Sequence, residues 1–352
     1  MKKLKIAQIA PLWFSIPPKK YGGTERIISH LTEELVKRGH EVTLFASGDS
    51  KTKGKLISPI KKHLCSFPDF DKKITWQEYV WNAFNTARAI ELSLKFDILH
   101  THWVWLPFLF SKFSKTPIIH TFHNIPKKED SRWKILEYYK NDINAVFISK
   151  SEKKNSKIKF NKNWVIYNGI DISQFKFNPK RGNHFIWVGR IDPAKGIQNA
   201  ILVAKETGEK LLFAGQLQEI WKNFFREKIK PYLSKNIKYV GELSQKELSN
   251  FYGKAKAFLY PIEWEEPFGL VMIEAMACGT PIIVFNRGSA KELVKDGKTG
   301  FVVENLKEMK EAMREIDKIK REDCRKWVEE NFTKERMAKE YENVYYQILK
   351  GK

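Results

Sequence analysis

The sequence EEPFGLVMIEAMACGTP, at residues 265–281, reads as the end of a strand, a turn, a helix and the start of another strand. Pro267 suits the first helical turn, where its missing N–H costs nothing. Gly279 suits the position after the last helical turn, where glycine adopts a left-handed conformation without strain. Short apolar runs that alternate with helices in this way are typical of parallel strands covered on both faces, so this stretch predicts an α/β fold.

The turn before this helix is predicted to bind a ligand. Gly269 would lie in the first helical turn, where glycine weakens a helix by about 1 kcal/mol relative to alanine. A ligand that needs close approach to the backbone explains such a glycine better than helix stability does. The N–H groups of Phe268, Gly269 and Leu270 would then bind a phosphate or a sugar hydroxyl.

Two carboxylates flank the turn, Glu266 and Glu274, which are 274 − 266 = 8 residues apart. A rise of about 1.5 Å per residue would separate them by roughly 12 Å along a helix. Acceptor groups at that spacing fit the hydroxyls at the two ends of a sugar nucleotide. The alternative is a capping Glu266 and a solvated Glu274. However, Glu274 is set among apolar residues, and a carboxylate in so apolar a helix needs a partner.

A second stretch, VGRIDPAKG at residues 188–196, follows a predicted strand and opens a helix. Its spacing is neither that of a Walker motif nor GxGxxG, so it indicates neither a P-loop nor a nicotinamide site. Arg190 and Lys195 can surround a diphosphate, Arg190 through forked hydrogen bonds and Lys195 as a point charge. They would stabilise the charge that grows on a leaving diphosphate. The alternative is that both are solvated surface residues.

Strands and helices alternate along the rest of the chain. The apolar runs expected to form strands lie at 4–10, 41–46, 97–101, 117–122, 145–149, 185–188, 210–214, 237–240, 257–260, 281–285 and 301–303. Helices are expected from the Gly22-Gly23 loop to about Arg38, near 76–95 and 131–140, and in three segments that end the chain. The polar stretch 168–183 separates two doubly wound domains, whose strands would direct their carboxyl ends toward a shared cleft.

These motifs together resemble a known family. The Glu266-x7-Glu274 block with PFG inside it, the Gly-Arg-x-Asp-x-x-Lys-Gly stretch and Asn168-Gly169-Ile170-Asp171 are similar to the retaining glycosyltransferases of family 4, which have the GT-B fold. Pro17-Pro18, Tyr21–Glu25 and Phe45–Ser50 resemble most the branch with the avilamycin-type enzymes. The resemblance implies two Rossmann-like domains facing a central cleft, at 1–170 on the acceptor side and 171–334 on the donor side. A C-terminal helix at 335–352 would cross back to the first domain.

The resemblance also implies a role for each matching residue. Arg190 and Lys195 would bind the donor diphosphate, Glu274 the ribose hydroxyls and Glu266 a hydroxyl of the transferred sugar. The amides of Phe268, Gly269 and Leu270 would hold sugar and phosphate, Gly22 and Gly23 would approach the diphosphate, and His123 would lie at the sugar. The implied reaction moves a hexose-type sugar from a UDP or GDP donor with retention at the anomeric carbon. The leaving phosphate helps to deprotonate the acceptor, so no protein nucleophile is required.

A metal site is considered and not expected. His100, His102, His120 and His123 lie near strand ends, but no acidic or cysteine partner stands at ligand spacing. Asp69-Phe70-Asp71 is a DxD triplet in a Lys-rich loop, which alone is a weak sign of a cation site. The expectation is therefore a metal-independent enzyme whose only cofactor-like ligand is the nucleotide sugar. Asp49, after the second strand, either touches an acceptor or caps a turn.

Composition bounds the environment of the protein. The chain has 352 residues, 63 Lys or Arg, 41 Asp or Glu and a formal net charge of +22. Three cysteines without metal-ligand spacing suit a reducing compartment, and the apolar runs are too short to span a membrane. No nucleic-acid-binding motif accompanies the charge, so the interpretations kept are a solvated lysine surface and contact with anionic lipid. The expected location is the cytoplasm, with contact at the inner face of the membrane as a hypothesis.

The segment 127–162 carries that hypothesis, with 11 Lys or Arg against 5 Asp or Glu. Its aromatic residues could rest on a membrane beside a lipid-linked acceptor, or Trp133, Leu136 and Tyr139 could pack inward at helical spacing. A soluble glycan or a small molecule would be the other kinds of acceptor. Two rival functions stay open, a nucleotide-sugar epimerase or hydrolase of the same fold and a non-enzymatic protein that binds polyanions.

Overall fold

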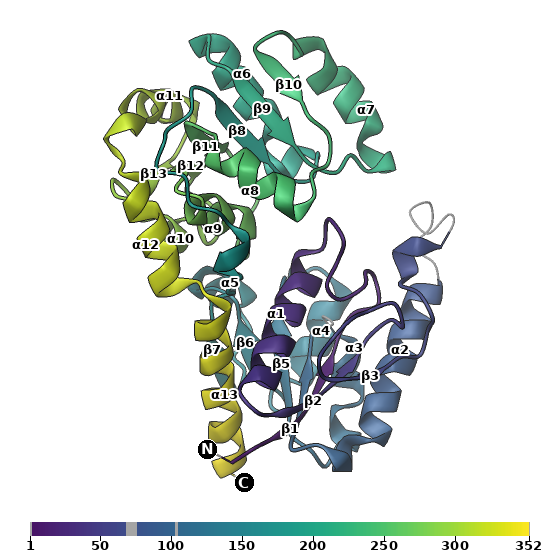
Figure 1. The fold of residues 1–352 in the computed structure, drawn as a ribbon. Coiled ribbons are helices and arrows are strands. Elements are labelled where there is room, and N and C mark those ends of the chain that lie inside the picture. The colour runs from purple at the N-terminus through teal and green to yellow at the C-terminus, as the bar shows by residue number, and fades with distance from the viewer. Residues whose placement is uncertain (1, 68–75, 103–104, 352) are drawn as a thin grey trace. The chain divides into compact units, whose positions relative to one another are not determined.

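The structure is a computed structural model that describes residues 2–67, 76–102 and 105–351. The chain divides into two compact units, Met1–Gly169 with Lys334–Lys352 and Ile170–Thr333. Each unit has one parallel β-sheet with helices packed against it (Figure 1). We refer to them as the first unit and the second unit. Because Asp69-Phe70-Asp71 lies outside the described residues, the DxD triplet has no structural account.

The first unit has a seven-stranded parallel sheet in the order β3-β2-β1-β4-β5-β6-β7. Its strands are β1 Lys5–Ile9, β2 Glu41–Phe45, β3 Lys55–Ile57, β4 Ile98–Thr101, β5 Ile118–Phe122, β6 Asn144–Phe147 and β7 Lys162–Val165. The α-helices of this unit are α1 Gly23–Lys37, α2 Trp76–Glu91, α3 Leu106–Leu109, α4 Ser131–Tyr138, α5 Lys150–Ser156 and α13 Lys334–Lys350. The expected strands near 4–10, 41–46, 97–101, 117–122 and 145–149 are thus present, and β3 and β7 were not foreseen.

Helices cover both faces of this sheet, because neighbouring residues of a strand point to opposite sides. Leu44 of β2 packs in a buried cluster with Ile28 of α1. The next residue, Phe45, packs in a different cluster with Ala89 of α2. Helices α1 and α2 therefore lie on opposite faces, which explains why the strands read as continuous apolar runs.

The C-terminal helix α13 packs on α1 within the first unit. Glu342 of α13 accepts hydrogen bonds from Nε of Arg38, 3.0 Å away, and pairs with Nε2 of His40, 2.9 Å away. Deeper along the helix, the hydroxyl of Tyr345 lies 2.7 Å from Nδ1 of His100 on β4. Helix α13 therefore contributes polar side chains to the interior of the first unit, beside strand β4.

The second unit has a six-stranded parallel sheet in the order β10-β9-β8-β11-β12-β13. Its strands are β8 Phe185–Val188, β9 Leu211–Ala214, β10 Ile237–Tyr239, β11 Ala257–Tyr260, β12 Ile282–Phe285 and β13 Gly300–Val303. Its α-helices are α6 Ile197–Thr207, α7 Lys222–Phe224, α8 Gln245–Gly253, α9 Leu270–Ala277, α10 Ala290–Leu293, α11 Leu306–Glu315 and α12 Arg321–Asn331. All six strands expected in this half of the chain are present.

Both sheets reverse their order beside their first strand, between β1 and β4 in the first unit and between β8 and β11 in the second. This is the classical doubly wound order, and the loops that leave neighbouring strands in opposite directions open a crevice at the carboxyl ends of the strands there. The predicted two-domain Rossmann-like architecture is confirmed. The helices of the described residues include none that is long and apolar enough to cross a membrane.

Candidate active site

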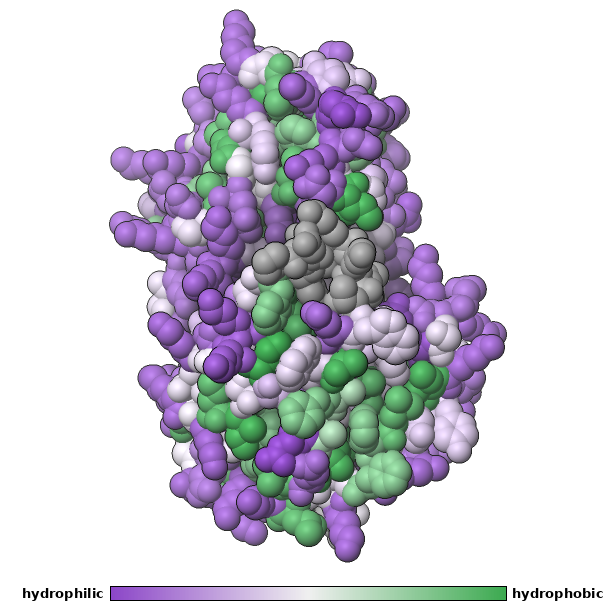
Figure 2. All heavy atoms as spheres, turned by 90° about the vertical axis from the view of Figure 1, so that its right-hand side faces the viewer, coloured by the Kyte–Doolittle hydropathy of each residue, from purple (hydrophilic) through white to green (hydrophobic). Residues whose placement is uncertain are grey.

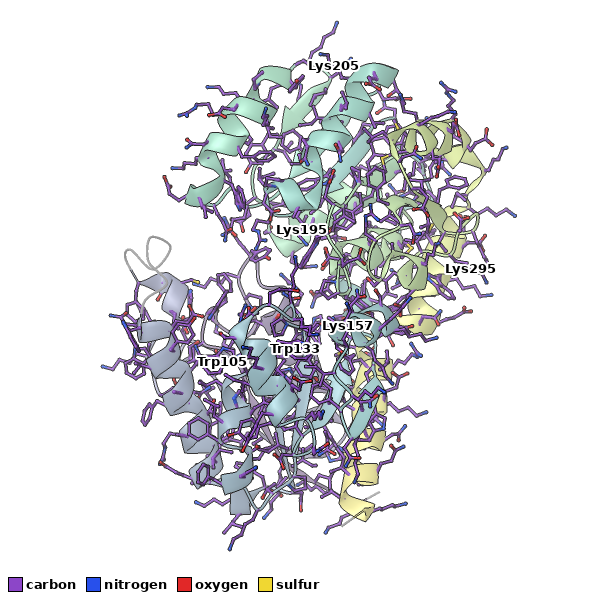
Figure 3. All side chains as sticks on the ribbon, turned by 180° about the vertical axis from the view of Figure 1, so that it is seen from behind. Trp105, Trp133, Lys157, Lys195, Lys205 and Lys295 are labelled. Carbon is purple, nitrogen blue, oxygen red and sulfur yellow. The ribbon has the colours of Figure 1, made fainter. Side chains whose placement is uncertain are left out.

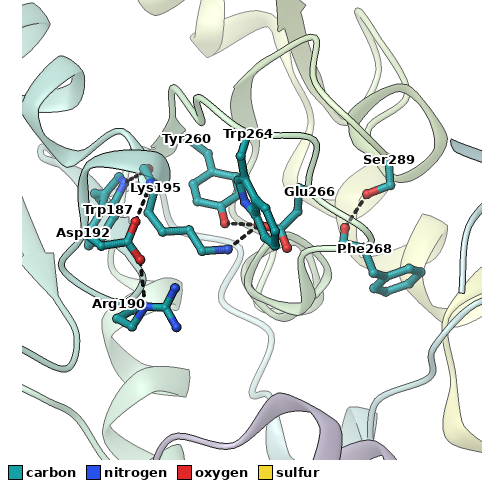
Figure 4. A network of polar contacts seen from close by, with 9 residues as sticks. All are labelled: Trp187, Arg190, Asp192, Lys195, Tyr260, Trp264, Glu266, Phe268 and Ser289. Carbon is teal, nitrogen blue, oxygen red and sulfur yellow. Dashed lines mark hydrogen bonds and ion pairs between the residues drawn. The ribbon is translucent and has the colours of Figure 1, made fainter. Parts of the chain in front are cut away.

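In the second unit the candidate site centres on Glu266, in the loop after β11. One oxygen of its carboxylate, Oε2, accepts hydrogen bonds from Nζ of Lys195 at 2.6 Å, the hydroxyl of Tyr260 at 2.9 Å and Nε1 of Trp264 at 3.1 Å (Figure 4). Glu266 is 8% exposed, so these donors replace the water that a carboxylate would otherwise bind. The structure brings Lys195 and Glu266 into direct contact, which their distance in sequence did not predict.

Lys195 is placed by the tight turn that follows β8. Asp192 begins the 3₁₀ turn Pro193–Lys195 by accepting the backbone N–H of Lys195, and Trp187 donates to the Lys195 carbonyl at 3.2 Å. Gly196 follows with φ +75°, and an added Cβ there would lie 1.8 Å from the carbonyl oxygen of Pro261. This glycine lets the β8 turn touch the β11 loop, so the Lys195 ammonium reaches Glu266 and lies 4.5 Å from the Trp264 ring centroid.

Arg190 lies beside the same turn, at the end of β8. Its Nε donates to Oδ2 of Asp192 at 2.7 Å, and Asp192 is buried (Figure 4). Asp192 thus fixes both the backbone turn and the guanidinium. The result is two cations, Arg190 and Lys195, on one short segment at the point where the sheet reverses, an arrangement suited to a diphosphate.

The loop 265–269 and helix α9 correct two sequence-based expectations. Helix α9 begins at Leu270, so Pro267 lies before the first helical turn and the helical rise does not measure the spacing of Glu266 and Glu274. Gly269 is the N-cap with φ +85°, and a Cβ there would meet Met272 at 2.6 Å. Its backbone conformation alone requires glycine, without any ligand. Gly279, with φ +86° directly after the helix, does end α9 as predicted.

The same loop is held in place from the β12 side. The hydroxyl of Ser289 donates to the Phe268 carbonyl at 2.6 Å, and the Ser289 N–H donates to the Glu266 carbonyl at 2.9 Å. Since Leu270 is the first residue of α9, the N–H groups at this end have no acceptor within the helix. The turn at Phe268, Gly269 and Leu270 is therefore held by Ser289 and leads directly into α9.

Glu274 is buried on α9, as its apolar sequence neighbours indicated, and it has the partner that such a carboxylate needs. The hydroxyl of Tyr252 on α8 donates to Glu274 Oε2 at 3.0 Å. A solvated Glu274 is thereby excluded. Whether the carboxylate also binds ribose hydroxyls stays a prediction.

In the first unit a cavity of about 420 Å³ lies at the reversal between β1 and β4. Gly22, Gly23 and His123 line it, together with His102 and a set of aromatic residues. Gly22 caps α1 with φ +141°, and a Cβ there would lie 2.8 Å from Pro18, so the loop can pass this point only with glycine. Gly22, Gly23 and His123, which were all predicted for the site, therefore line the same pocket.

Two carboxyls in this cavity were missed by the sequence reading. Glu25, in the first turn of α1, is buried, and burial raises its pKa to about 7. Burial also raises the pKa of Glu78 on α2. The available signal was an acidic residue close after the Gly22-Gly23 loop, but a local pattern does not show that its side chain is buried. A carboxyl that titrates near neutral pH can hold or accept a proton in a site.

Three of the four histidines near the strand ends come together in the first unit, whereas His120 packs against Phe108 and Phe122. The ring centroids of His100 and His102 are 4.2 Å apart and those of His102 and His123 5.3 Å apart. His102 bonds to His123, and the other hydrogen bonds of these rings go to amide and hydroxyl groups. Within residues 2–67, 76–102 and 105–351, no group of three or more His, Cys, Asp or Glu is arranged to hold a metal. Asp49 accepts from the backbone N–H and Nδ1 of His63, so it orders that loop.

The segment 127–162 has its aromatic residues mostly turned inward. Trp133, which is labelled in Figure 3, and Leu136 are buried in a cluster of the first unit, and Tyr139 packs against that cluster. Trp133, Leu136 and Tyr139 therefore pack inward and do not form an exposed face. Four lysines of this segment, Lys153, Lys154, Lys157 and Lys159, are exposed.

Two family models match the chain. The model for glycosyl transferases group 1 matches residues 170–334, and the model for glycosyltransferase family 4 matches residues 21–174. These ranges correspond closely to the second unit and to most of the first. The site residues Arg190, Lys195, Glu266 and Glu274 all lie within the group 1 match.

Individual glycosyltransferases are also similar to this chain over most of its length. The glycogen synthase of Mycobacterium tuberculosis is 26% identical over 332 residues, covering 81% of this chain and 79% of its own. The crystal structure of AviGT4, a glycosyltransferase involved in avilamycin A biosynthesis, has a TM-score of 0.75 at 21% identity and covers 99% of both chains. Anabaena HepE, solved with UDP and glucose, has a TM-score of 0.75 at 17% identity, covering 98% of this chain and 100% of its own.

At these identities the two solved structures show the fold alone. The family models show which two domains the chain contains. The expected GT-B fold and the family 4 resemblance are both confirmed. The chain belongs to the GT-B glycosyltransferases, with a family 4 domain followed by a group 1 domain.

Proposed function

We propose that this protein is a retaining glycosyltransferase that moves a hexose-type sugar from a UDP- or GDP-linked donor to an acceptor hydroxyl. The observation that carries the proposal is the group around Glu266. A buried carboxylate, a lysine and an arginine gather at the carboxyl edge of the second sheet, where it reverses its order. Cations bind a diphosphate, and the carboxylate, which already accepts three donors, can accept a sugar hydroxyl in place of one of them.

The proposed chemistry needs charge stabilisation more than a protein nucleophile. As the sugar leaves, negative charge grows on the diphosphate, and Arg190 and Lys195 would stabilise it. The Lys195 ammonium would then bind both Glu266 and the phosphate. Because Glu266 would also bind the sugar, binding of the sugar and stabilisation of the leaving group would depend on the same lysine. The leaving phosphate would take the proton of the acceptor, with retention at the anomeric carbon. No metal ion has a part in this proposal.

The ligands of two solved structures of similar fold support a nucleoside diphosphate as the leaving group of the donor. HepE was crystallised with UDP and glucose, and the catalytic domain of starch synthase IV from Arabidopsis thaliana was crystallised with ADP. UDP is therefore our first choice for this chain, and GDP is the alternative. The acceptor is proposed to be a glycan, a lipid-linked glycan or a small molecule.

The first test is a panel of UDP-, GDP-, ADP- and dTDP-sugars in thermal-shift and turnover assays. A true donor should raise the melting temperature, because it binds the folded state, and turnover should persist in EDTA. Rapid conversion of the donor without any acceptor would favour the epimerase or hydrolase instead. A complete loss in EDTA that metal restores would contradict the metal-independent mechanism.

Glu274→Ala should raise the donor KM by about 10- to 100-fold. The reason is that each charge-assisted hydrogen bond from a ribose hydroxyl contributes about 1.5–3 kcal/mol. Tyr252→Phe is the matched control, because it removes the hydroxyl that binds Glu274 and keeps the carboxylate. Steady-state kinetics that find KM unchanged in Glu274→Ala would remove Glu274 from the donor site.

Arg190→Ala and Lys195→Ala should each lower kcat by more than they raise the donor KM. Charge on the diphosphate is greatest in the transition state, so the lost stabilisation falls mainly on kcat. Lys205→Ala is the control, since Lys205 is an exposed lysine of the same unit that lies over the Tyr232 ring, away from Lys195 (Figure 3). Full activity in Arg190→Ala or Lys195→Ala would exclude that residue from the reaction.

We further propose that the enzyme works in the cytoplasm and rests on the anionic inner face of a membrane. The exposed lysines of 127–162 would provide the attraction, each contributing about 1 kcal/mol. The apolar contact would come from α2, where Trp76 is 84%, Val80 56% and Phe84 46% exposed. These residues recur at helical spacing, and Figure 2, which faces the side of α2, shows apolar side chains gathered in its lower part.

Vesicle co-sedimentation tests this contact. The protein should sediment with phosphatidylglycerol vesicles at low salt and be released as salt rises. Replacing Lys153, Lys154, Lys157 and Lys159 by Gln, or Trp76 and Phe84 by Ser, should weaken sedimentation. The control with equal charge loss replaces exposed lysines of the second unit, Lys228, Lys235, Lys246 and Lys307. Protein that stays in the supernatant at low salt would contradict membrane contact and favour a soluble acceptor.

A further inference from the structure

A chain of hydrogen bonds leads from the interior of the first sheet to the cavity of the first unit. Gln8 lies in the middle strand β1 and is fully buried. Its amide oxygen is 2.8 Å from Nε2 of His102, which follows β4. The other ring nitrogen of His102, Nδ1, is 3.1 Å from Nε2 of His123, which follows β5 and lines the cavity.

The orientation of the Gln8 amide is set at its other end. Its Nε2 donates to the hydroxyl of Tyr345 at 3.3 Å, and Nδ1 of His100 lies 3.4 Å from the same nitrogen. An amide nitrogen carries two protons and an amide oxygen carries none. The amide nitrogen therefore faces the Tyr345 hydroxyl as a donor, and the amide oxygen faces His102 as an acceptor.

The protons along the chain follow from this orientation. Because the Gln8 oxygen can only accept, His102 must carry its proton on Nε2. A neutral His102 then has a bare Nδ1, which can only accept, so His123 must carry its proton on Nε2. The Nδ1 of His123 is left without a proton. None of the hydrogen bonds found among the described residues uses that atom.

We infer that Gln8 and His102 are positioning residues that hold His123 as its Nε2-protonated neutral tautomer, so that Nδ1 accepts a hydrogen bond from a sugar hydroxyl. The assignment of that hydroxyl to a sugar rests on the proposed function. A bare ring nitrogen cannot donate to a phosphate oxygen. The partner of this Nδ1 would therefore be a hydroxyl and not an unprotonated phosphate oxygen.

Burial supports the neutral state of these rings. Desolvation lowers the pKa of His123 to about 4, and it lowers the pKa values of His102 and His100 well below their usual range. A protonated His102 would have no bare nitrogen for His123, and burial of a charged ring without a carboxylate partner is costly.

The tautomer can be measured directly in the unmodified protein. Long-range ¹H–¹⁵N spectra of ¹⁵N-histidine-labelled protein at pH 7 distinguish the two nitrogens of each ring, and the signals of His123 are those that disappear in His123→Asn. We expect the proton on Nε2. A proton on Nδ1 would mean that the Gln8 amide is reversed, and this result overturns the inference. The measurement needs neither donor nor acceptor, so failure of the proposed glycosyl transfer would not affect it.

One substitution of Gln8 tests whether it sets the tautomer. Gln8→Met removes the acceptor of His102 Nε2, so His102 and then His123 should populate both tautomers. An unchanged His123 spectrum in folded Gln8→Met would overturn the role of Gln8.

His102→Phe tests the link to activity, because it keeps a ring in place and removes the acceptor of His123. A hydrogen bond of this kind contributes about 0.5–1.5 kcal/mol, so kcat should fall roughly 2- to 10-fold with little change in KM. His120→Asn is the control. It perturbs a buried histidine whose hydrogen bond goes to Thr101, which is not part of the series of hydrogen bonds from Gln8 to His123. An effect on kcat that is the same in His120→Asn and His102→Phe would reduce His102 to a structural role and overturn the inference.

Discussion

A parallel strand can be reached only by a crossover over one face of the sheet, and this constraint organises both units. In each sheet the chain first winds to one side of the starting strand and then to the other. The two winding directions separate the loops at one place on the carboxyl edge, beside β1 in the first unit and beside β8 in the second. The residues around Glu266 and the cavity at Gly22 occupy these two places for the same topological reason.

A buried carboxylate at such a place must be neutralised or bound. Lys195, Tyr260 and Trp264 together provide three donors to one oxygen of Glu266. They come from the turn after β8, the end of β11 and the loop after β11, and the β8 turn meets the β11 loop only because Gly196 permits close contact. The interaction also orients Lys195 before any ligand arrives. A cation that is held in this way loses little conformational entropy when it binds a diphosphate, which is the physical advantage of a pre-organised site.

The first unit also buries polar groups at the centre of its sheet, but these groups are neutral. Its central polar groups are an amide, hydroxyls and neutral imidazoles, and Tyr341 and Tyr345 of α13 complete the set. Since neutral hydrogen-bonding groups cost less to bury than charges, this network can extend through the middle of a sheet. It also gives the C-terminal helix a role beyond packing, because its tyrosines fix the partners on which the orientation of Gln8 depends.

The sequence by itself determined the fold class, the two domains and most of the strands, because buried parallel strands are short apolar runs that any reading of hydrophobicity detects. It missed β3 and β7, which are edge strands whose residues are half-buried or exposed and therefore lack such a run. It also identified Arg190, Lys195, Glu266 and Glu274 as special, since their residue types are unusual at strand ends and within an apolar helix.

Only the tertiary structure decided what these residues contact. The partner of Lys195 is 71 residues away, Glu274 is bound by Tyr252 on another helix, and Gln8 meets Tyr345 across 337 positions. The sequence also placed Pro267 and Gly269 inside a helix that begins only at Leu270, because a local pattern does not reveal where backbone dihedral angles turn positive. Hydrogen bonds between remote segments depend on strand order and on side-chain direction, and neither is encoded in the spacing of residues along the chain.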